Sequence, residues 1–398
     1  AIDTQSTYNP KTFPSTQKQF DLAKLLAKEL EDLGVVDVSI ADNANVYGTL
    51  PANVEPECAP SIGFSAHLDT TPELTGTDVK ARVVEQYDGK DIVLNKEKNI
   101  VMRVEQFPHL KQYIGQDLVV TDGTTLLGAD DKAGLAEIMG MLQYFHDHPE
   151  VPHGEIQVFF PSDEEVGCFG SENFDPDCFK PDFAYTLDGG ALGSISYECF
   201  NAATATVTVE GINIHPGLSK NQMKNAILIA QEYLQLLPAA ETPGHTEGYE
   251  GYYHVIEFHG EVEETVMKFY VRDHDKEKFE RRKMLMRDAA TYLNAVYGEN
   301  TVKVDIEDTY NNFAEVILPK FEIVEAVQDA MSKLGVESFI TPMRGGTDGS
   351  VLSFQGIPTP NLCTGGHNFH GRYEYVPVQS MEKISEILIE IVKSFVKE

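Results

Sequence analysis

The sequence is short of positive charge, and this shortage excludes several classes of partner. It contains 31 Lys and Arg residues against 63 Asp and Glu residues, which gives a formal net charge of −32 at pH 7. A surface this acidic repels the phosphates of nucleic acids and the headgroups of anionic lipids. We therefore expect neither a nucleic acid nor a membrane as a partner.

The sequence also lacks long apolar runs and paired cysteines. No apolar stretch approaches the ~20 residues that span a bilayer, and no signal-peptide pattern opens the chain. The five cysteines are widely spaced and include no C-x-x-C pair, which favours free thiols in a reducing compartment. We expect a cytoplasmic enzyme of bacterial type. The chain begins at Ala1 without a Met, which raises the question of a missing N-terminal segment.

The length and the order of elements predict two domains. At 398 residues the chain is too long for one ordinary hydrophobic core. Residues 201–308 have the order strand, helix, strand, strand, helix, strand, which is the ferredoxin-like pattern. Strands and helices alternate before and after this region, as in an α/β protein. We predict a first catalytic part at 1–200, an inserted domain at 201–308 and a second catalytic part at 309–398.

The segment 126–134 is the most informative stretch of the chain. It places Asp130 and Asp131 between a glycine-hinged turn and an apolar helix. A carboxylate at this position lies where ligands collect in α/β sheets, and the electropositive start of the helix keeps it ionised. The plainer interpretation is that one of the two aspartates caps the helix.

Further acidic residues follow other apolar strands. The run 156–160 leads to Glu164 and Glu165, and the run 183–187 leads to Asp188. One glutamate of such a pair can bind a metal while its neighbour accepts a proton.

A third apolar run, residues 61–66, leads to His67 and Asp69. Because a strand alternates its side chains, these two residues point to one side. Together with the acidic strand ends they form a cluster whose carboxylates would repel one another unless cations were bound there.

Other polar candidates lie in the second half of the chain. His215 lies in a Gly- and Pro-containing turn and Arg272 at the end of a strand, so a turn residue and a strand-end ion pair are the plainer interpretations. Arg344 lies in a Gly-rich turn that lets the backbone approach a ligand closely, and it can pair with a carboxylate. His367 and His370 lie in another Gly-rich segment that can supply one further metal ligand.

Together these motifs resemble those of the di-zinc peptidases, a family that includes carboxypeptidase G, aminoacylase and succinyl-diaminopimelate desuccinylase. The resemblance covers nearly the whole chain. It rests on H-L-D-T (67–70), T-L-L-G-A-D-D-K-A-G (125–134), D-E-E-V-G (163–167), D-G-G (188–190), H-P-G (215–217), T-E-G-Y-E-G (246–251), R-G-G-T-D-G (344–349) and T-G-G-H-N-F-H-G (364–371). It implies an α/β catalytic domain, with a mixed sheet flanked by helices, and an inserted ferredoxin-like βαββαβ lid domain that also serves dimerisation.

The resemblance also implies a cofactor. Two Zn²⁺ ions are expected per chain, with Co²⁺ or Mn²⁺ as substitutes. One ion is held by His67, Asp130 and Asp188, and the other by Asp130, Glu165 and His370, so that Asp130 bridges the pair. His370 is chosen over His367 because its His-Gly pair aligns with the family motif.

Roles for further residues follow from the same resemblance. Glu164 is the expected general base, and Asp69 is expected to orient His67 and to raise its basicity. The peptide bond between Asp130 and Asp131 is expected to be cis.

In the inserted domain and the turn after it, His215 is expected to stabilise the oxyanion, and Arg272 and Arg344 to bind the C-terminal carboxylate of the substrate. Whether His215 acts within one chain or from a partner subunit of a homodimer stays open.

We therefore predict a metallo-aminopeptidase whose partners are short peptides. The T-E-G-Y-E-G motif favours the members of the family that release the N-terminal residue from tripeptides. A dipeptidase or an N-acyl-amino-acid deacylase is the alternative within the family, because the metal ligands are shared. A peptide-binding module without catalysis is disfavoured by the intact Glu164, and a two-metal phosphoesterase is disfavoured by the scarcity of cationic residues.

Overall fold

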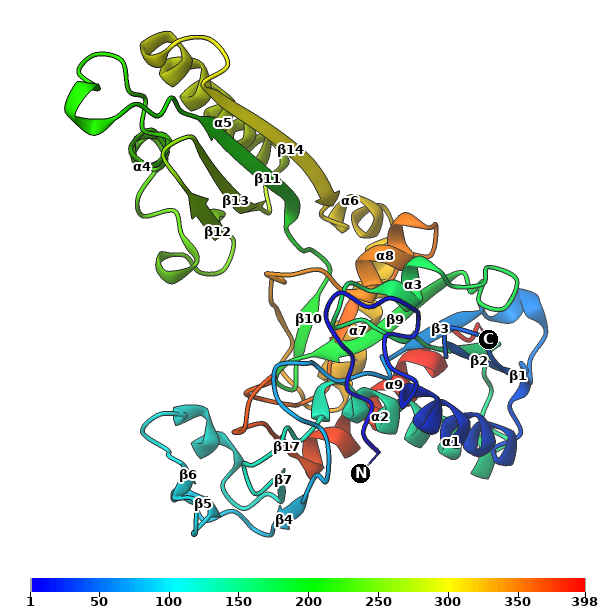
Figure 1. Cartoon of the computed structure of the whole chain (residues 1–398). Helices are drawn as coiled ribbons and strands as arrows, with labels where there is room; N and C mark the ends of the chain where they lie inside the picture. Colours follow the sequence, from blue (N-terminus) through cyan, green and yellow to red (C-terminus); the bar gives the residue numbers. More distant parts are fainter. Residues whose placement is uncertain (1, 398) are drawn as a thin grey trace. The chain divides into compact units, whose positions relative to one another are not determined.

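The computed structural model describes residues 2–397 of the chain, which divides into two compact units (Figure 1). The first unit consists of Ala1–Tyr197, Glu315–Thr341 and Thr347–Glu398, and the second of Glu198–Ala314 and Pro342–Gly346. Every helix among the described residues is too short or too polar to cross a membrane.

The second unit takes in two stretches that the sequence assigned to the second catalytic part, residues 309–314 and 342–346. Hydrogen bonds explain the second stretch. The Met343 N–H donates to Glu198 O at 3.0 Å, and Met343 O lies 2.9 Å from His274 Nε2. Element order along a sequence does not reveal such a long-range return of the chain.

The first unit is built on a mixed eight-stranded sheet. In spatial order its strands are β1 (Val36–Ile40), β2 (Val46–Leu50), β8 (Ile156–Phe160), β3 (Ile62–Ser65), β9 (Phe183–Gly189), β16 (Asn361–Cys363), β10 (Ser194–Ser196) and β15 (Phe339–Ile340). β3 runs parallel to both β8 and β9, and β16 runs parallel to β9. The centre of the sheet is therefore parallel, and its strands β3 and β8 are buried along their whole length.

Helices flank this sheet. α1 (Gln19–Asp32) packs on β1 and β2, α2 (Ala129–Asp147) packs on β3 and β9, and α8 (Asp348–Phe354) packs on β9. α9 (Val378–Ser394) packs on α2 and on α7 (Glu322–Lys333). Two further helices, α3 (Phe169–Glu172) and α6 (Ala314–Ile317), are short. The predicted α/β architecture, a mixed sheet flanked by helices, is confirmed.

Two smaller sheets belong to the same unit. One has the order β17 (Tyr375–Pro377), β7 (Leu118–Val120) and β4 (Arg82–Val84), and the other is the hairpin of β5 (Ile92–Asn95) and β6 (Ile100–Met102). Their apolar side chains form one buried cluster that includes Met102, Leu118 and Tyr375. This cluster anchors the chain immediately after the segment that carries His370.

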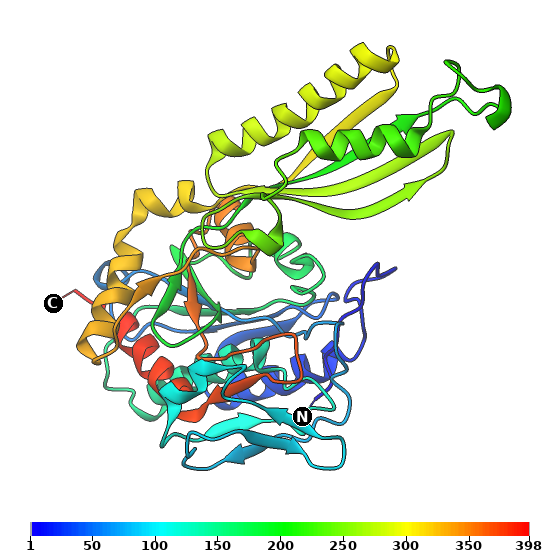
Figure 2. The same ribbon diagram turned by 90° about the vertical axis from the view of Figure 1, so that its left-hand side faces the viewer.

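The second unit has a four-stranded antiparallel sheet with two long helices on one face (Figure 2). The strands lie in the order β12 (Tyr252–Gly260), β13 (Glu264–Asp273), β11 (Asn201–Glu210) and β14 (Val302–Tyr310), and the helices are α4 (Ala226–Leu236) and α5 (Lys276–Tyr297). Alternate residues of β11 and β13 pack against these helices in one core. Along the chain this is the βαββαβ order that the sequence predicts.

Candidate active site

The acidic strand-end residues of the first unit lie together at one edge of the large sheet. β3 ends two residues before His67, β8 ends four residues before Glu164, and β9 contains Asp188. Because these three strands are parallel neighbours, their carboxyl ends meet at the same edge, where α/β sheets bind ligands.

Asp130 is the centre of the cluster. Its Oδ1 lies 3.0 Å from His67 Nε2, and its Oδ2 lies 3.1 Å from His370 Nε2. The first imidazole is also 3.9 Å from Asp188 Oδ1, and the second is 3.0 Å from Glu165 Oε2. One carboxylate therefore faces two imidazoles, each of which has a second carboxylate beside it. The five expected metal ligands lie in one place.

These side chains suit divalent cations. Among the described residues, His67, Asp130 and Glu165 form one set of ligand atoms within 4.8 Å of one another, and His67, Asp131 and Asp188 form a second. Imidazole nitrogens and carboxylate oxygens are ordinary ligands of Zn²⁺. Among the expected ligands, Glu165 has one oxygen, Oε1, that is buried without a hydrogen-bond partner, and a cation would supply that partner. The residues present therefore fit a metal centre.

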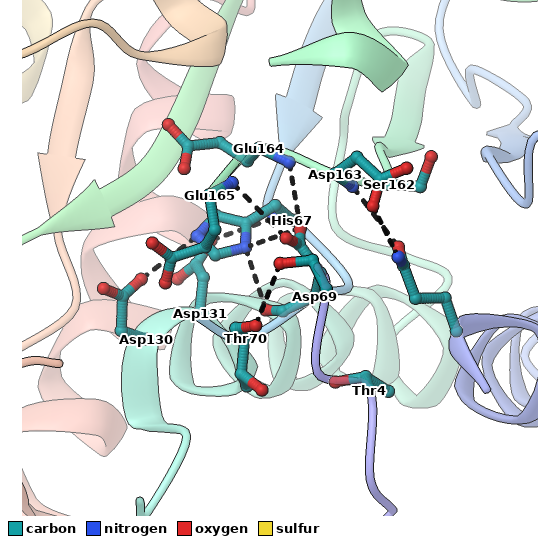
Figure 3. A network of polar contacts seen from close by, with 12 residues as sticks. Thr4, His67, Asp69, Thr70, Asp130, Asp131, Ser162, Asp163, Glu164 and Glu165 are labelled. Carbon is teal, nitrogen blue, oxygen red and sulfur yellow. Dashed lines mark hydrogen bonds and ion pairs between the residues drawn. The ribbon is translucent and has the colours of Figure 1, made fainter. Parts of the chain in front are cut away.

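The turn before α2 has the geometry that the motif implies. The peptide bond between Asp130 and Asp131 is cis, as expected. The interpretation that one of these aspartates caps the helix is wrong, because neither carboxylate accepts a hydrogen bond from an N–H of α2. The carboxylate oxygens of Asp130 face His67 and His370, and Asp131 Oδ1 has no hydrogen-bond partner among the described residues. Asp131 instead accepts a hydrogen bond from the His67 N–H at 3.0 Å (Figure 3). The sequence did not single out this role, although the adjacent acidic pair was its signal.

The pKa values of His67, His370 and Asp188 are shifted in the direction that adds positive charge to the site or removes negative charge from it. Burial alone would lower the pKa of His67, but hydrogen bonds to Asp130 and Asp69 raise it well above its usual range. Hydrogen bonds to Asp130 and Glu165 raise the pKa of His370 to about 11. Burial and the charge of Asp130 raise the pKa of Asp188. Protons on the two imidazoles thus supply the charge that cations would supply in their place.

Asp69 connects His67 to the glutamate pair. Its side chain is fully buried and accepts hydrogen bonds from the N–H groups of Glu164 and Glu165, at 2.9 and 3.3 Å (Figure 3). His67 Nδ1 lies 3.1 Å from the Asp69 backbone oxygen and 3.5 Å from its carboxylate. Asp69 therefore fixes the orientation of the imidazole and the course of the turn that carries both glutamates.

Glu164 is held beside the ligand cluster. Its Oε1 accepts a hydrogen bond from Cys168 Sγ at 3.7 Å, and Figure 3 shows its carboxylate apart from those of Glu165 and Asp130. Burial and the charge of Asp188 raise its pKa well above the usual range. A carboxylate with a raised pKa can accept a proton and later release it.

His367 lies in a different environment from His370. Its Nε2 is 2.6 Å from the Tyr113 hydroxyl, and its ring stacks on Tyr375. Burial lowers its pKa to about 4. The structure therefore keeps His367 neutral within an aromatic cluster and brings His370 to Asp130.

The three substrate-binding candidates, His215, Arg272 and Arg344, all lie on the second unit and are described within it. His215 precedes a short 3₁₀ turn, where its Nδ1 accepts from the Gly217 N–H at 3.2 Å. Arg272 lies in β13, where it donates to Ala203 O at 3.0 Å and lies over the rings of Tyr270 and Tyr310. Their expected roles toward a substrate stay predictions.

Arg344 is the third of these candidates and fastens a loop of the second unit. It donates to Gly248 O at 2.8 Å, to Glu250 O at 2.9 Å and to Thr246 Oγ1 at 2.9 Å, and its guanidinium lies over the ring of Phe200. It thereby holds the T-E-G-Y-E-G motif. Its binding of a substrate carboxylate stays a prediction.

Comparison with known proteins identifies the family. The model of the peptidase family M20/M25/M40 matches residues 120–394, and that of the peptidase family M28 matches residues 45–194. The chain is 51% identical over 392 residues to the Peptidase T of Halothermothrix orenii, which covers 98% of this chain and 96% of that relative.

Solved structures share the fold. The aminopeptidase PepT of Bacillus cereus has a TM-score of 0.77 at 24% identity, over 100% of this chain and 95% of that one. A tripeptidase of Staphylococcus aureus has a TM-score of 0.76 at 23% identity, over 100% and 96%. A dinuclear metal-binding peptidase of Bacillus subtilis has a TM-score of 0.62 at 12% identity, over 99% and 94%. Together with the near-full-length relative and the matched family model, these findings show that the chain belongs to the peptidase family M20/M25/M40.

Proposed function

We propose that the protein is a metallo-aminopeptidase that releases the N-terminal residue from tripeptides in the cytoplasm. The observation that carries the proposal is the position of Asp130, whose two oxygens face His67 and His370 at 3.0 and 3.1 Å. The names of the similar proteins, Peptidase T and tripeptidase, support the substrate class.

We assign two divalent cations to this site, with Zn²⁺ as the first choice and Co²⁺ or Mn²⁺ as substitutes. His67, Asp130 and Asp188 would hold one cation, and Asp130, Glu165 and His370 the other. When bound, cations of this kind polarise a peptide carbonyl and make water a better nucleophile at neutral pH. The alternative ligand Asp131 already binds the His67 N–H through Oδ2, so we assign it a supporting role.

Glu164 would move the proton. In the hydrolysis of a peptide bond, a water oxygen bonds to the carbonyl carbon to give a tetrahedral oxyanion, and the C–N bond then breaks. The carboxylate of Glu164 accepts a proton from the water and delivers it to the leaving amine nitrogen. Asp69 would position the groups that take part in this step, because its carboxylate lies beside His67 Nδ1 and accepts a hydrogen bond from the Glu164 N–H.

The second unit would bind the far end of the substrate. We propose that His215 donates a hydrogen bond to the oxyanion and that Arg272 and Arg344 attract the C-terminal carboxylate. We also propose that this unit mediates a homodimer. The apolar side chains of Val255 and Phe258 are exposed on its edge strand β12, which supports a protein partner there.

The test compares three substrates with and without a chelator. Purified protein is analysed for metal content and then given Leu-Gly-Gly, Leu-Gly and N-acetyl-leucine. We expect about two metals per chain and selective, chelator-sensitive release of leucine from the tripeptide. If only the dipeptide or the acylated amino acid is cleaved, the alternative of a dipeptidase or N-acyl-amino-acid deacylase replaces the proposal.

A further inference from the structure

A buried carboxylate that the sequence analysis did not single out lies behind the centre of the proposed site. Glu374 is 1% exposed and immediately precedes β17. It follows His370 by four residues, on the segment that joins this histidine to the small sheet. A buried carboxylate without a compensating partner is costly, so its contacts indicate what it does.

All of the described hydrogen bonds to the Glu374 carboxylate come from the turn that carries Asp130. Oε1 accepts from the Asp130 N–H at 3.0 Å. Oε2 accepts from the N–H groups of Leu127 and Gly128, at 3.0 and 2.8 Å. Both oxygens are therefore used, and the three donors belong to four consecutive residues.

The backbone of this turn departs from helical geometry. Gly128 has φ 76°, in the left-handed region, and α2 has no side-chain cap at its start. Leu127 and Gly128 precede the helix, and Asp130 has non-helical φ and ψ. The N–H groups of these residues therefore need an acceptor outside the helix. Glu374 performs this function from a segment more than 240 residues away.

The same bonds connect two proposed metal ligands. Asp130 is held through its own N–H, and His370 is part of the segment to which Glu374 belongs. The separation between the Asp130 carboxylate and the His370 imidazole, 3.1 Å between Oδ2 and Nε2, therefore depends on where Glu374 holds the turn. Mutation of a group that hydrogen-bonds and orients a metal ligand typically lowers metal affinity or activity about 10- to 100-fold.

We propose that Glu374 is a positioning residue of the metal centre, which fixes Asp130 relative to His370 through the amides of residues 127–130. The inference rests on the proposed metallopeptidase function. Glu374 touches neither a substrate nor a metal in this assignment, and its effect on the reaction passes through Asp130.

The test is Glu374→Gln in the full chain. Glutamine keeps the size of the side chain, but its amide nitrogen cannot accept a hydrogen bond, so either the Asp130 bond or the pair from Leu127 and Gly128 is lost. We expect the dissociation constant for Zn²⁺, measured by competition with a chelating dye, to rise about 10- to 100-fold. Activity toward Leu-Gly-Gly is expected to fall at limiting Zn²⁺ and to recover largely at saturating Zn²⁺.

The matched control is Glu382→Gln, which makes the same chemical change at an exposed position of α9, and which is expected to leave Zn²⁺ affinity unchanged. Glu374→Asp keeps both acceptor oxygens on a side chain shorter by one methylene, and it is expected to lie between the wild type and Glu374→Gln. If Glu374→Gln does not fold, Glu374→Asp takes its place in the same measurement.

An unchanged Zn²⁺ dissociation constant in the folded variant, with only a lower melting temperature, would overturn the inference, because a merely structural residue would behave in that way. This failure differs from failure of the proposed function. In the latter case the wild-type protein itself would neither retain Zn²⁺ nor cleave Leu-Gly-Gly.

Discussion

Asp69 accepts a hydrogen bond from the Glu164 N–H at 2.9 Å, while the same carboxylate oxygen lies 3.5 Å from His67 Nδ1. One buried side chain thus controls a proposed metal ligand and the proposed base together. This relationship separates Asp69 from an ordinary buried aspartate, because both of its neighbours belong to the proposed site.

Asp69→Asn is therefore expected to reduce kcat about 10- to 100-fold while most of the metal is retained. The oxygen of the asparagine amide can still accept a hydrogen bond. Its nitrogen cannot, and it would replace an oxygen that accepts from the Glu164 or the Glu165 N–H. The measurement is kcat and KM for Leu-Gly-Gly at saturating Zn²⁺, together with metal content. A wild-type kcat in Asp69→Asn would show that the contacts of Asp69 serve folding alone.

Substitution of Glu164 is expected to reduce turnover, whereas substitution of Glu165 is expected to reduce metal binding. Glu164→Gln removes the proton acceptor, so turnover of Leu-Gly-Gly should fall about 10²- to 10⁴-fold while Zn²⁺ binding persists. Glu165→Gln removes a carboxylate that lies 3.0 Å from His370, so it should weaken metal binding first. Turnover and metal content are measured in both variants.

This pair of variants contains its own control, because each makes the same chemical change one residue apart. The assignment of the base is wrong if Glu164→Gln turns over at the wild-type rate, or if it loses metal while Glu165→Gln keeps it.

Much of this site follows from local sequence pattern. Carboxylates at the ends of apolar strands meet at one edge of a parallel sheet, so Glu165 and Asp188 converge on His67 for topological reasons. The βαββαβ order of the second unit is likewise a local pattern, in which helix and strand periodicities alternate.

Other features depend on distant partners and left no local signal. Glu374 lies in a short loop, and its role is set by amides at 127–130. Residues 342–346 join the second unit because Met343 bonds to Glu198 and His274. Such long-range hydrogen bonds are fixed by tertiary packing, which neither periodicity nor motif spacing records.

Protons and metals should compete at the proposed site. The pKa of His370 is raised to about 11 by its carboxylate partners, so the stability that it contributes to the metal-free protein is complete below its ordinary pKa of 6.5 and is lost as pH rises toward 11. His67 acts in the same direction. We expect the melting temperature of the chelated protein to fall between pH 6.5 and pH 9.

Added Zn²⁺ binds the deprotonated nitrogens, so the rise in melting temperature that it causes should be larger at pH 9 than at pH 6.5. Calorimetry of the chelated and the Zn²⁺-loaded protein measures both trends. His370→Gln removes one titrating group and should flatten the curve of the chelated protein. A rise in melting temperature with pH in the chelated wild type would contradict this account.

The close packing of α2 on β9 gives a further prediction. A Cβ on Gly134 would lie 2.3 Å from Leu187 O and 2.7 Å from Asp131 Oδ1, whereas a Cβ on Gly140, in the same helix, would lie 3.0 Å from the movable hydroxyl of Ser385. Both substitutions to Ala gain up to about 1 kcal/mol of helix propensity. Only Gly134→Ala must move a backbone carbonyl next to Asp188, and overpacking of this kind costs about 1–3 kcal/mol or more.

We therefore expect Gly134→Ala to lower the free energy of unfolding and to weaken Zn²⁺ binding, because the first turn of α2 carries Asp130 and Leu187 precedes Asp188. Gly140→Ala should be neutral or slightly stabilising and should bind Zn²⁺ as the wild type does. Urea unfolding and dye competition measure the two quantities in each variant. Equal stability and equal Zn²⁺ affinity in both variants would contradict this prediction. That result would mean that α2 can shift away from Leu187 without moving the metal ligands.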